Sequence, residues 1–187
     1  MRLPQFLGFS LLVLLSCSGS EWEDLYQPDK TNFRITGTST WSWEDGILTA
    51  SGDTTLSYMI SKSSYRNFEL ELEFYPDDEV NSGIFIRCTE EEMSDETCYE
   101  INIWDLHPIP EWRTGAIVKR ADPLNYVETN NKWNTYRIRA EDTSIKAWIN
   151  GVAVADIIDE ELPEGTIGLQ RGRKGKIKFR NIKIRSL

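Results

Sequence analysis

The chain has 187 residues, of which 40% are hydrophobic and 11% aromatic, enough for one domain with a substantial core. Its formal net charge of −9 argues against a nucleic-acid phosphate backbone as partner and favours a neutral or weakly charged ligand. Seven Trp, seven Tyr and seven Phe are typical of a β-rich protein, because flat side chains pack well on a pleated sheet.

The first element in chain order is an export signal. A lone Arg2 precedes an apolar run over 6–15, which is too short to span a bilayer but long enough for a signal-peptide core. The run ends in "LLSC", and Ser16 before Cys17 resembles the bacterial lipobox. The sequence therefore predicts a lipoprotein, lipidated on Cys17 and facing the periplasm or anchored in the outer membrane; an ordinary secretory signal is the alternative.

Three segments follow from this interpretation: a signal peptide over 1–16, a lipidated cysteine with a polar tether over 17–27, and one domain over 28–187. The domain contains short apolar runs separated by turn residues. We expect strands over 41–43, 47–50, 56–61, 68–74, 83–88, 98–104, 115–118, 133–140, 144–149, 152–157, 166–170 and 176–184.

The pattern within these runs is that of antiparallel sheets. "FELELEF" over 68–74 and "KIKFRNIKI" over 176–184 alternate apolar and polar residues, as half-buried strands do. Asn150-Gly151 lies between two runs and predicts a tight hairpin, since both turn positions need positive φ. No long stretch has a helical period, so the sequence predicts a single-domain all-β sandwich or jelly roll.

Two cysteines remain if Cys17 carries lipid. Cys88 and Cys98 would both be exported, and an even pair in an oxidising compartment is most simply a disulfide. A zinc site built on them is improbable, because His107 is the only histidine.

Seven motifs together carry a resemblance to a known family. They are "NSGIFIR", "YEINIWD", "TGAIV", "KWNTYRIRA", "INGVAV", "GTIGLQ" and "KFRNIKI". In this order and spacing, over about 22–187, the chain resembles the 3-keto-disaccharide hydrolase domain family, also described as 3-keto-glucoside lyase/hydratase. The chain departs from the family pattern at Asn102 and Val118, and it reads "RGRKGK" where the family commonly has an acidic residue and a histidine.

The resemblance implies a concanavalin A-like jelly roll of two antiparallel sheets with a concave, sugar-facing surface. It also implies a hydrolase or lyase acting on small glycosides whose glucose carries a ketone at C3. Such an enzyme would depend on a sugar 3-dehydrogenase acting upstream. The alternatives are a non-catalytic carbohydrate-binding module of the same fold, or a surface domain without a sugar site.

The chemistry requires a base, a partner for an enolate oxygen and an acid for the leaving group. A ketone at C3 acidifies the C2 proton, whose removal allows β-elimination at C1, and water then adds to the enone. We expect Glu100 or His107 to take the proton and Arg87 to stabilise the enolate. Asp105 would orient His107, or Glu100, Asp105 and His107 together would bind a divalent metal cation as cofactor.

Each candidate also has a structural alternative. Arg87 could pair with the neighbouring acidic loop, and Asp105 could cap the turn before two prolines. His107 lies in the same loop and could be an ordinary surface residue. A further six residues are expected to bind the sugar: Asn81, Asn102, Trp104, Trp112, Gln170 and Arg171. The two tryptophans could instead be core residues, and "RGRKGK" could be a solvated turn.

Strand parity gives this site a geometric test. If Cys88 lies directly opposite Cys98, paired residue numbers sum to 186 and Arg87 and Glu100 face opposite sides of the sheet. A shared site needs a sum of 187 or a bulge. The family resemblance favours the second arrangement, with the disulfide at the edge of the site.

Overall fold

The computed structural model describes residues 20–26, 28, 32–52, 55–89 and 92–187. The predicted signal peptide and the lipidation site at Cys17 lie outside the described residues. Among the residues described, no helix is long and apolar enough to cross a membrane.

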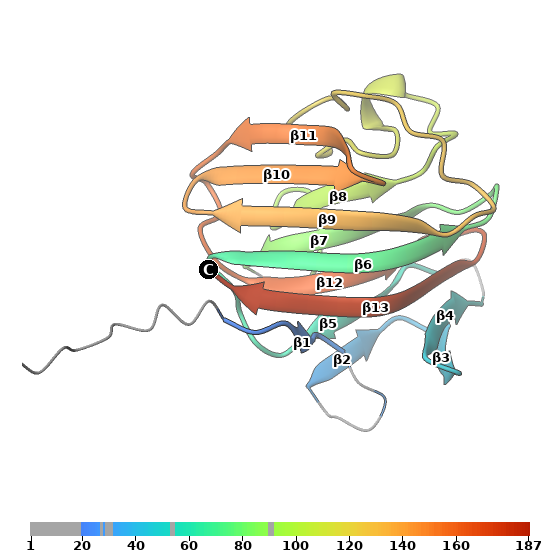
Figure 1. Cartoon of the computed structure of the whole chain (residues 1–187). Helices are drawn as coiled ribbons and strands as arrows, with labels where there is room; N and C mark the ends of the chain where they lie inside the picture. The colour runs from blue at the N-terminus through green and yellow to red at the C-terminus, as the bar shows by residue number, and fades with distance from the viewer. Residues whose placement is uncertain (1–19, 27, 29–31, 53–54, 90–91) are drawn as a thin grey trace, which may run out of the picture.

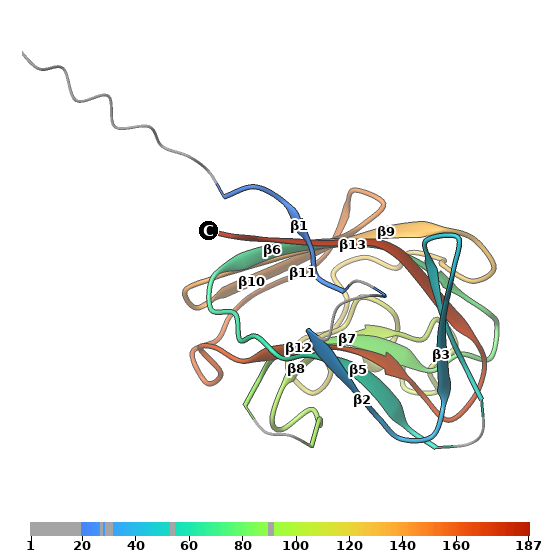
Figure 2. The ribbon, with the colours of Figure 1, turned by 90° about the horizontal axis from the view of Figure 1, so that it is seen from below.

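Two antiparallel sheets face each other (Figures 1 and 2). The larger has the order β11-β10-β9-β6-β13-β4-β3, with β1 paired to β13. Its strands are β1 (Glu23–Asp24), β3 (Thr40–Glu44), β4 (Ile47–Ser51), β6 (Phe68–Pro76), β9 (Asn134–Glu141), β10 (Ser144–Ile149), β11 (Val152–Ile158) and β13 (Ile177–Ser186). The predicted all-β sandwich of the jelly-roll class is confirmed.

The smaller sheet has the order β2-β5-β12-β7-β8 and lies behind the larger one in Figure 1. Its strands are β2 (Phe33–Thr36), β5 (Ser57–Ser61), β7 (Ser82–Cys88), β8 (Tyr99–Ile103) and β12 (Thr166–Arg171). One 3-10 turn, η1 (Pro110–Trp112), lies in the long connection from β8 to β9.

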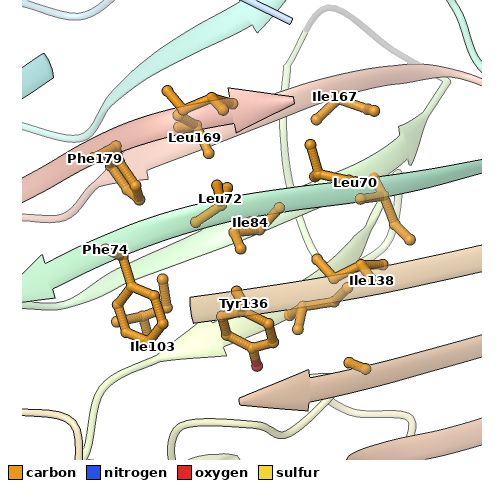
Figure 3. Packing of buried hydrophobic residues seen from close by; sticks show 14 of the residues in the cluster. Leu70, Leu72, Phe74, Ile84, Ile103, Tyr136, Ile138, Ile167, Leu169 and Phe179 are labelled. Atoms are coloured by element: carbon orange, nitrogen blue, oxygen red, sulfur yellow. The ribbon is translucent and has the colours of Figure 1, made fainter. Parts of the chain in front are cut away.

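The core fills the space between the sheets because each strand turns alternate residues inward. Leu70, Leu72 and Phe74 of β6 point toward Ile84 of β7 and Leu169 of β12 (Figure 3). All five side chains are fully buried. Burial of this continuous apolar layer supplies the main driving force for folding. The opposite face of the smaller sheet is therefore free to carry a site.

Local sequence signals account for the hairpins. Asn150 and Gly151 have φ values of 51° and 81° and connect β10 to β11, as expected for a two-residue turn. The predicted strand over 115–118 is wrong: only Ile117 forms isolated bridges, to Ile101 and Ala121. This segment pairs briefly with β8 and then turns back, so it adds no full strand.

Candidate functional site

A polar row crosses the outward face of the smaller sheet. Tyr58 pairs with Gln170, Gln170 with Gly83, and Gly83 with Asn102, so positions on four strands are aligned and three of them carry polar side chains. Phe85 and Glu100 form the next pair along the same face. These residues alternate with Met59, Ile84, Ile101 and Leu169 of the core, which fixes their outward direction.

A pocket of about 440 Å³ lies over these rows. We call it the sheet pocket; its floor contains Tyr58, Phe85, Glu100, Asn102 and Gln170. Its walls include Asn81, Met93, Asp95, Trp104, His107, Trp112, Val118, Lys119 and Arg173. The volume lies within the range of small-ligand sites.

Glu100 is the carboxylate on the pocket floor. It lies beside Gly83, where an added Cβ would come within 3.4 Å of its Oε1. The pKa of Glu100 is raised to about 7, mainly by burial and in addition by the nearby Asp95 carboxylate, while Lys119 opposes the change. A carboxyl with this pKa is suited to exchange a proton near neutral pH.

The segment after η1 covers the free edge of β8 and brings Lys119 to the pocket. Asn102 N donates to Ala116 O over 3.0 Å, and Val118 N donates to Glu100 O over 3.0 Å. Lys119 follows at once, with a left-handed φ of 61°. Its Nζ lies 2.6 Å from Asp95 Oδ2. A charged pair thus lies at the pocket wall, close to Glu100.

The predicted disulfide is confirmed and lies beside the pocket. Cys88 and Cys98 are bonded, with their Cα atoms 4.2 Å apart. Met93, on the segment between them, joins the two cysteines and Phe85 in an apolar cluster on the pocket face. The bridge therefore ties the loop that carries Asp95 to the sheet that carries Glu100.

An aromatic wall closes another side. The His107 ring lies 4.3 Å from the Trp104 ring centroid and 5.5 Å from that of Trp112. Asn102 Nδ2 donates to Trp112 O and fixes the turn that carries this tryptophan. Both tryptophans are half-buried pocket residues rather than core residues. Their position agrees with the expected sugar-binding surface.

Tyr58 and Gln170 form the polar part of the floor. Gln170 Nε2 donates to Tyr58 Oη over 3.3 Å. Gln170 Oε1 is buried and accepts no hydrogen bond from any residue in the described part of the chain. Burial raises the pKa of Tyr58, so its hydroxyl keeps its proton at neutral pH. A ligand hydroxyl donating to Gln170 Oε1 would satisfy the buried oxygen.

The predicted place of Arg87 in this pocket is wrong. Paired numbers between β7 and β8 sum to 185 up to Ile86 and Tyr99, and Arg87, with φ of 52°, is the extra residue before Cys88. Because of the bulge, the side chain on the pocket face at this point of β7 is that of Cys88. Arg87 is fully buried and donates through Nη2 to Arg66 O over 2.7 Å and through Nη1 to Leu162 O over 3.5 Å.

Asp105 is also turned away from the pocket, contrary to expectation. Its carboxylate accepts from Thr114 Oγ1 (2.5 Å), Thr129 N (2.6 Å), Thr129 Oγ1 (2.8 Å) and Asn130 N (3.2 Å). His107 is positioned by the backbone of Ile109 instead, at 3.0 Å from its Nδ1. Asp105 therefore joins two loops and does not orient the histidine.

The residues do not fit the expected divalent cation. Because Asp105 is committed to Thr129, Glu100, Asp105 and His107 do not converge on one point. No group of three His, Cys, Asp or Glu side chains within the described ranges is arranged to hold a metal ion.

Arg171 is the third correction. It is buried and donates through Nη2 to Gly52 O over 2.9 Å and to Gly175 O over 3.2 Å. The arginine at the pocket is Arg173, two residues further along. Side chains alternate along β12, so Arg171 faces away from the pocket because its neighbour Gln170 faces it. Arg173 lies in the loop after the strand, where alternation predicts nothing.

Sequence reasoning missed five further polar pocket residues: Tyr58, Ser94, Asp95, Lys119 and Arg173. Tyr58 occupies an outward position of a predicted strand, so parity could have found it. Lys119 directly follows the "TGAIV" motif, and its place beside this family motif could have indicated a pocket residue. Nothing local marked Asp95 among the other acidic residues of its loop.

Comparisons with known proteins match almost the whole domain. Residues 19–185 match the sequence model of the 3-keto-alpha-glucoside-1,2-lyase-like domain. A crystal structure of a candidate glycosyl hydrolase from Parabacteroides distasonis ATCC 8503 is similar, with 31% identity, a TM-score of 0.76, and coverage of 89% of this chain and 100% of that one. No curated protein sequence matches the chain.

Two more distant structures share the fold alone. Carbohydrate-binding module CBM66 from Bacillus subtilis has 18% identity and a TM-score of 0.63, covering 90% of this chain and 98% of that one. The β-glucanase of Bacillus licheniformis has 14% identity and a TM-score of 0.62, covering 91% and 99%. The fold thus occurs in both a binding module and an enzyme.

Proposed function

Because the chain belongs to the 3-keto-alpha-glucoside-1,2-lyase-like domain family, we propose that it cleaves 3-keto-glycosides in the sheet pocket. The reaction is removal of the C2 proton, β-elimination of the C1 substituent and hydration of the resulting enone. One observation carries this proposal: Glu100, a carboxylate with a pKa raised to about 7, lies on the floor of a pocket with aromatic walls.

Glu100 is the base. The C2 proton of a 3-keto sugar is acidified by the ketone, so a carboxylate with a raised pKa is a better match than an ordinary exposed one. His107, the other expected base, lies in the pocket wall against Trp104 and is the second choice. Its ring is held by aromatic contacts and by the Ile109 backbone, which suits a role in binding the sugar.

Tyr58 replaces Arg87 as the group at the ketone oxygen. Gln170 donates to Tyr58 Oη, which leaves the phenolic hydrogen free to donate to the enolate. Glu100 and Arg173 both act electrostatically on Tyr58, which places a base and a positive charge near this hydroxyl. Gln170 Oε1 accepts a sugar hydroxyl. The pocket then supplies a base, an oxyanion donor and orientation.

The test is incubation of purified protein with 3-keto-trehalose and a 3-keto-β-glucoside. We expect release of the aglycone and transient absorbance of an enone. Chelator should not change the rate, because the pocket residues that the structure describes form no metal-ligand set. The unoxidised parent glycosides are the control, since without the ketone the C2 proton is not acidic. Equal turnover of the parent glycosides would contradict the elimination mechanism.

A non-catalytic carbohydrate-binding module is the second candidate. The observation that favours it is that Arg87 and Asp105, two of the four expected catalytic residues, have structural roles outside the pocket. Binding of 3-keto-trehalose without any product would support this function. In that case Trp112→Ala should weaken binding while Glu100→Gln should not.

We also propose that the chain is an exported lipoprotein whose substrate comes from an enzyme class that oxidises sugars at C3. The support is the "LLSC" sequence at Cys17 together with the disulfide, a bond typical of oxidising compartments. Mass spectrometry of the N-terminal peptide from the membrane fraction should show an acylated Cys17. A soluble product with an unmodified N-terminal peptide would contradict the anchor.

A further inference from the structure

A second hollow adjoins the sheet pocket. It has a volume of about 410 Å³ and is lined by Ile109, Glu111, Trp112, Lys119, Arg120 and Asp122, among others. We call it the side hollow. Trp112 and Lys119 line both spaces and therefore mark their junction.

The walls of the side hollow are fixed. Arg120 Nη1 lies 3.0 Å from Asp159 Oδ2 and 2.5 Å from Glu161 Oε2, and its guanidinium stacks 4.9 Å from the Tyr99 ring centroid. Ala121 N donates to Ile117 O over 2.8 Å, which closes the turn that carries these residues. The hollow is therefore prearranged and does not need to form around a ligand.

The position of Lys119 is also fixed. Its backbone adopts a left-handed conformation that non-glycine residues rarely take, and such strain persists only where the surroundings hold it. The flanking Val118 N–H is bonded to Glu100 O, and the ammonium is bonded to Asp95 on the disulfide-closed loop. Backbone and side chain together hold the lysine between the two spaces.

Resting on the function proposed above, we propose that the side hollow binds the leaving half of the substrate, a neutral sugar. The 3-keto-glucosyl unit then occupies the sheet pocket, and its C1–O bond crosses the junction at Lys119, which protonates the departing oxygen. Trp112 offers a ring face to a sugar, and Arg120, Glu111 and Asp122 offer hydrogen bonds. The two carboxylates repel an anionic leaving group such as a sugar phosphate.

The proton and electron balance is complete within these groups. Glu100 takes the C2 proton, and the C2–H electron pair forms the enolate. As the C3 ketone returns, a C1–C2 double bond forms and the C1–O bond breaks with its electron pair on the leaving oxygen. The Lys119 ammonium gives that oxygen a proton, and the resulting amine takes one from solvent. Glu100 releases its proton to solvent, so the net products are an enone and an alcohol.

The experiment compares three substrates: 3-keto-trehalose, methyl 3-keto-α-glucoside and 4-nitrophenyl 3-keto-α-glucoside. The first has a sugar leaving group, the second a small one, and the third one that departs without a proton. The variants are Lys119→Met and Asp122→Tyr, both at exposed positions. Glu160→Tyr is the matched control for Asp122→Tyr, because it adds the same ring at an exposed carboxylate outside both spaces.

Lys119→Met should lower kcat about 10²–10³-fold for the two alkyl glycosides, as loss of a general acid does, and less than tenfold for the nitrophenyl substrate. Asp122→Tyr should lower the ratio of kcat/KM for 3-keto-trehalose over the methyl glycoside roughly tenfold, and Glu160→Tyr should not change it. Equal losses on all three substrates, or an unchanged ratio in Asp122→Tyr, would overturn the proposal. Wild-type protein that cleaves none of the three would overturn the proposed function itself.

Discussion

Replacing Glu100 with glutamine is expected to lower kcat on 3-keto-glycosides by roughly 10²–10⁴-fold, the usual effect of losing a general base. The amide keeps the shape of the carboxylate beside Gly83 but cannot take the C2 proton. In the wild type, kcat/KM should rise with pH and level off above about 7, because the carboxyl group must first ionise. Steady-state kinetics between pH 5 and 9 measure both effects.

The same substitution should stabilise the protein at high pH. Between pH 4.5 and about 7 the unfolded chain loses a proton from Glu100 that the folded chain retains, so stability falls as pH rises through this window. The cost in the wild type is about 3 kcal/mol above pH 7. Glu100→Gln removes this cost. The variant should therefore unfold at a higher denaturant concentration than the wild type at pH 8, and at the same concentration at pH 4.

Glu164→Gln is the control, since this glutamate is exposed and lies outside the sheet pocket. It should change neither turnover nor the pH dependence of stability. A Glu100→Gln variant that is both inactive and less stable at pH 8 would show that Glu100 holds the fold together, and the assignment as base would then fail.

The second large effect is expected at Glu69, on the outer face of the larger sheet. Its side chain is fully buried beneath three arginines from neighbouring strands. Oε1 accepts from Arg137 Nη2 over 2.6 Å and from Arg139 Nη1 over 3.1 Å, and Oε2 accepts from Arg185 Nε over 2.8 Å. Glu69→Gln leaves these cations without their counter-charge and should cost about 3 kcal/mol, a loss typical of breaking a buried ion pair.

The stability lost in Glu69→Gln should depend on pH in the direction opposite to the stability change in Glu100→Gln. Burial alone would raise the pKa of Glu69, but the hydrogen bonds from Arg137, Arg185 and Arg139 outweigh it and hold the pKa below its usual value. The carboxylate therefore stabilises the fold above about pH 4.5, and this contribution disappears as the pH falls through the lowered pKa. Urea unfolding at pH 7 and pH 3 measures the difference.

Glu71→Gln is the matched control, because Glu71 lies two residues along the same strand but is exposed. The melting temperature of the Glu71→Gln variant should stay close to that of the wild type, whereas that of Glu69→Gln should be roughly 6–12 °C lower. Turnover per folded molecule should be unchanged in both variants, since this face lies across the core from the sheet pocket. A drop in turnover at fully folded Glu69→Gln would show coupling between the two faces.

The alternation of apolar and polar residues along the chain is enough to predict the β-sandwich. Strand β6 reads Glu69, Leu70, Glu71, Leu72 and Glu73, and this alone fixes which face meets the core. The Asn150-Gly151 turn followed from local chemistry, and the Cys88–Cys98 bridge followed from an even pair of cysteines in a chain expected to be exported. Alternation is a property of the extended backbone, so it needs no knowledge of distant residues.

Only the tertiary structure decided which polar side chains meet. A one-residue bulge turns the Arg87 side chain away from the pocket face. The Asp105 carboxylate accepts a hydrogen bond from Thr129, which lies 24 residues further along the chain. Lys119 lines the same pocket as Glu100 because the segment before it pairs with the edge of β8. A bulge depends on the pairing of two strands, and a buried carboxylate binds whichever donors the loops bring to it. Neither is encoded in the spacing of residues along one strand.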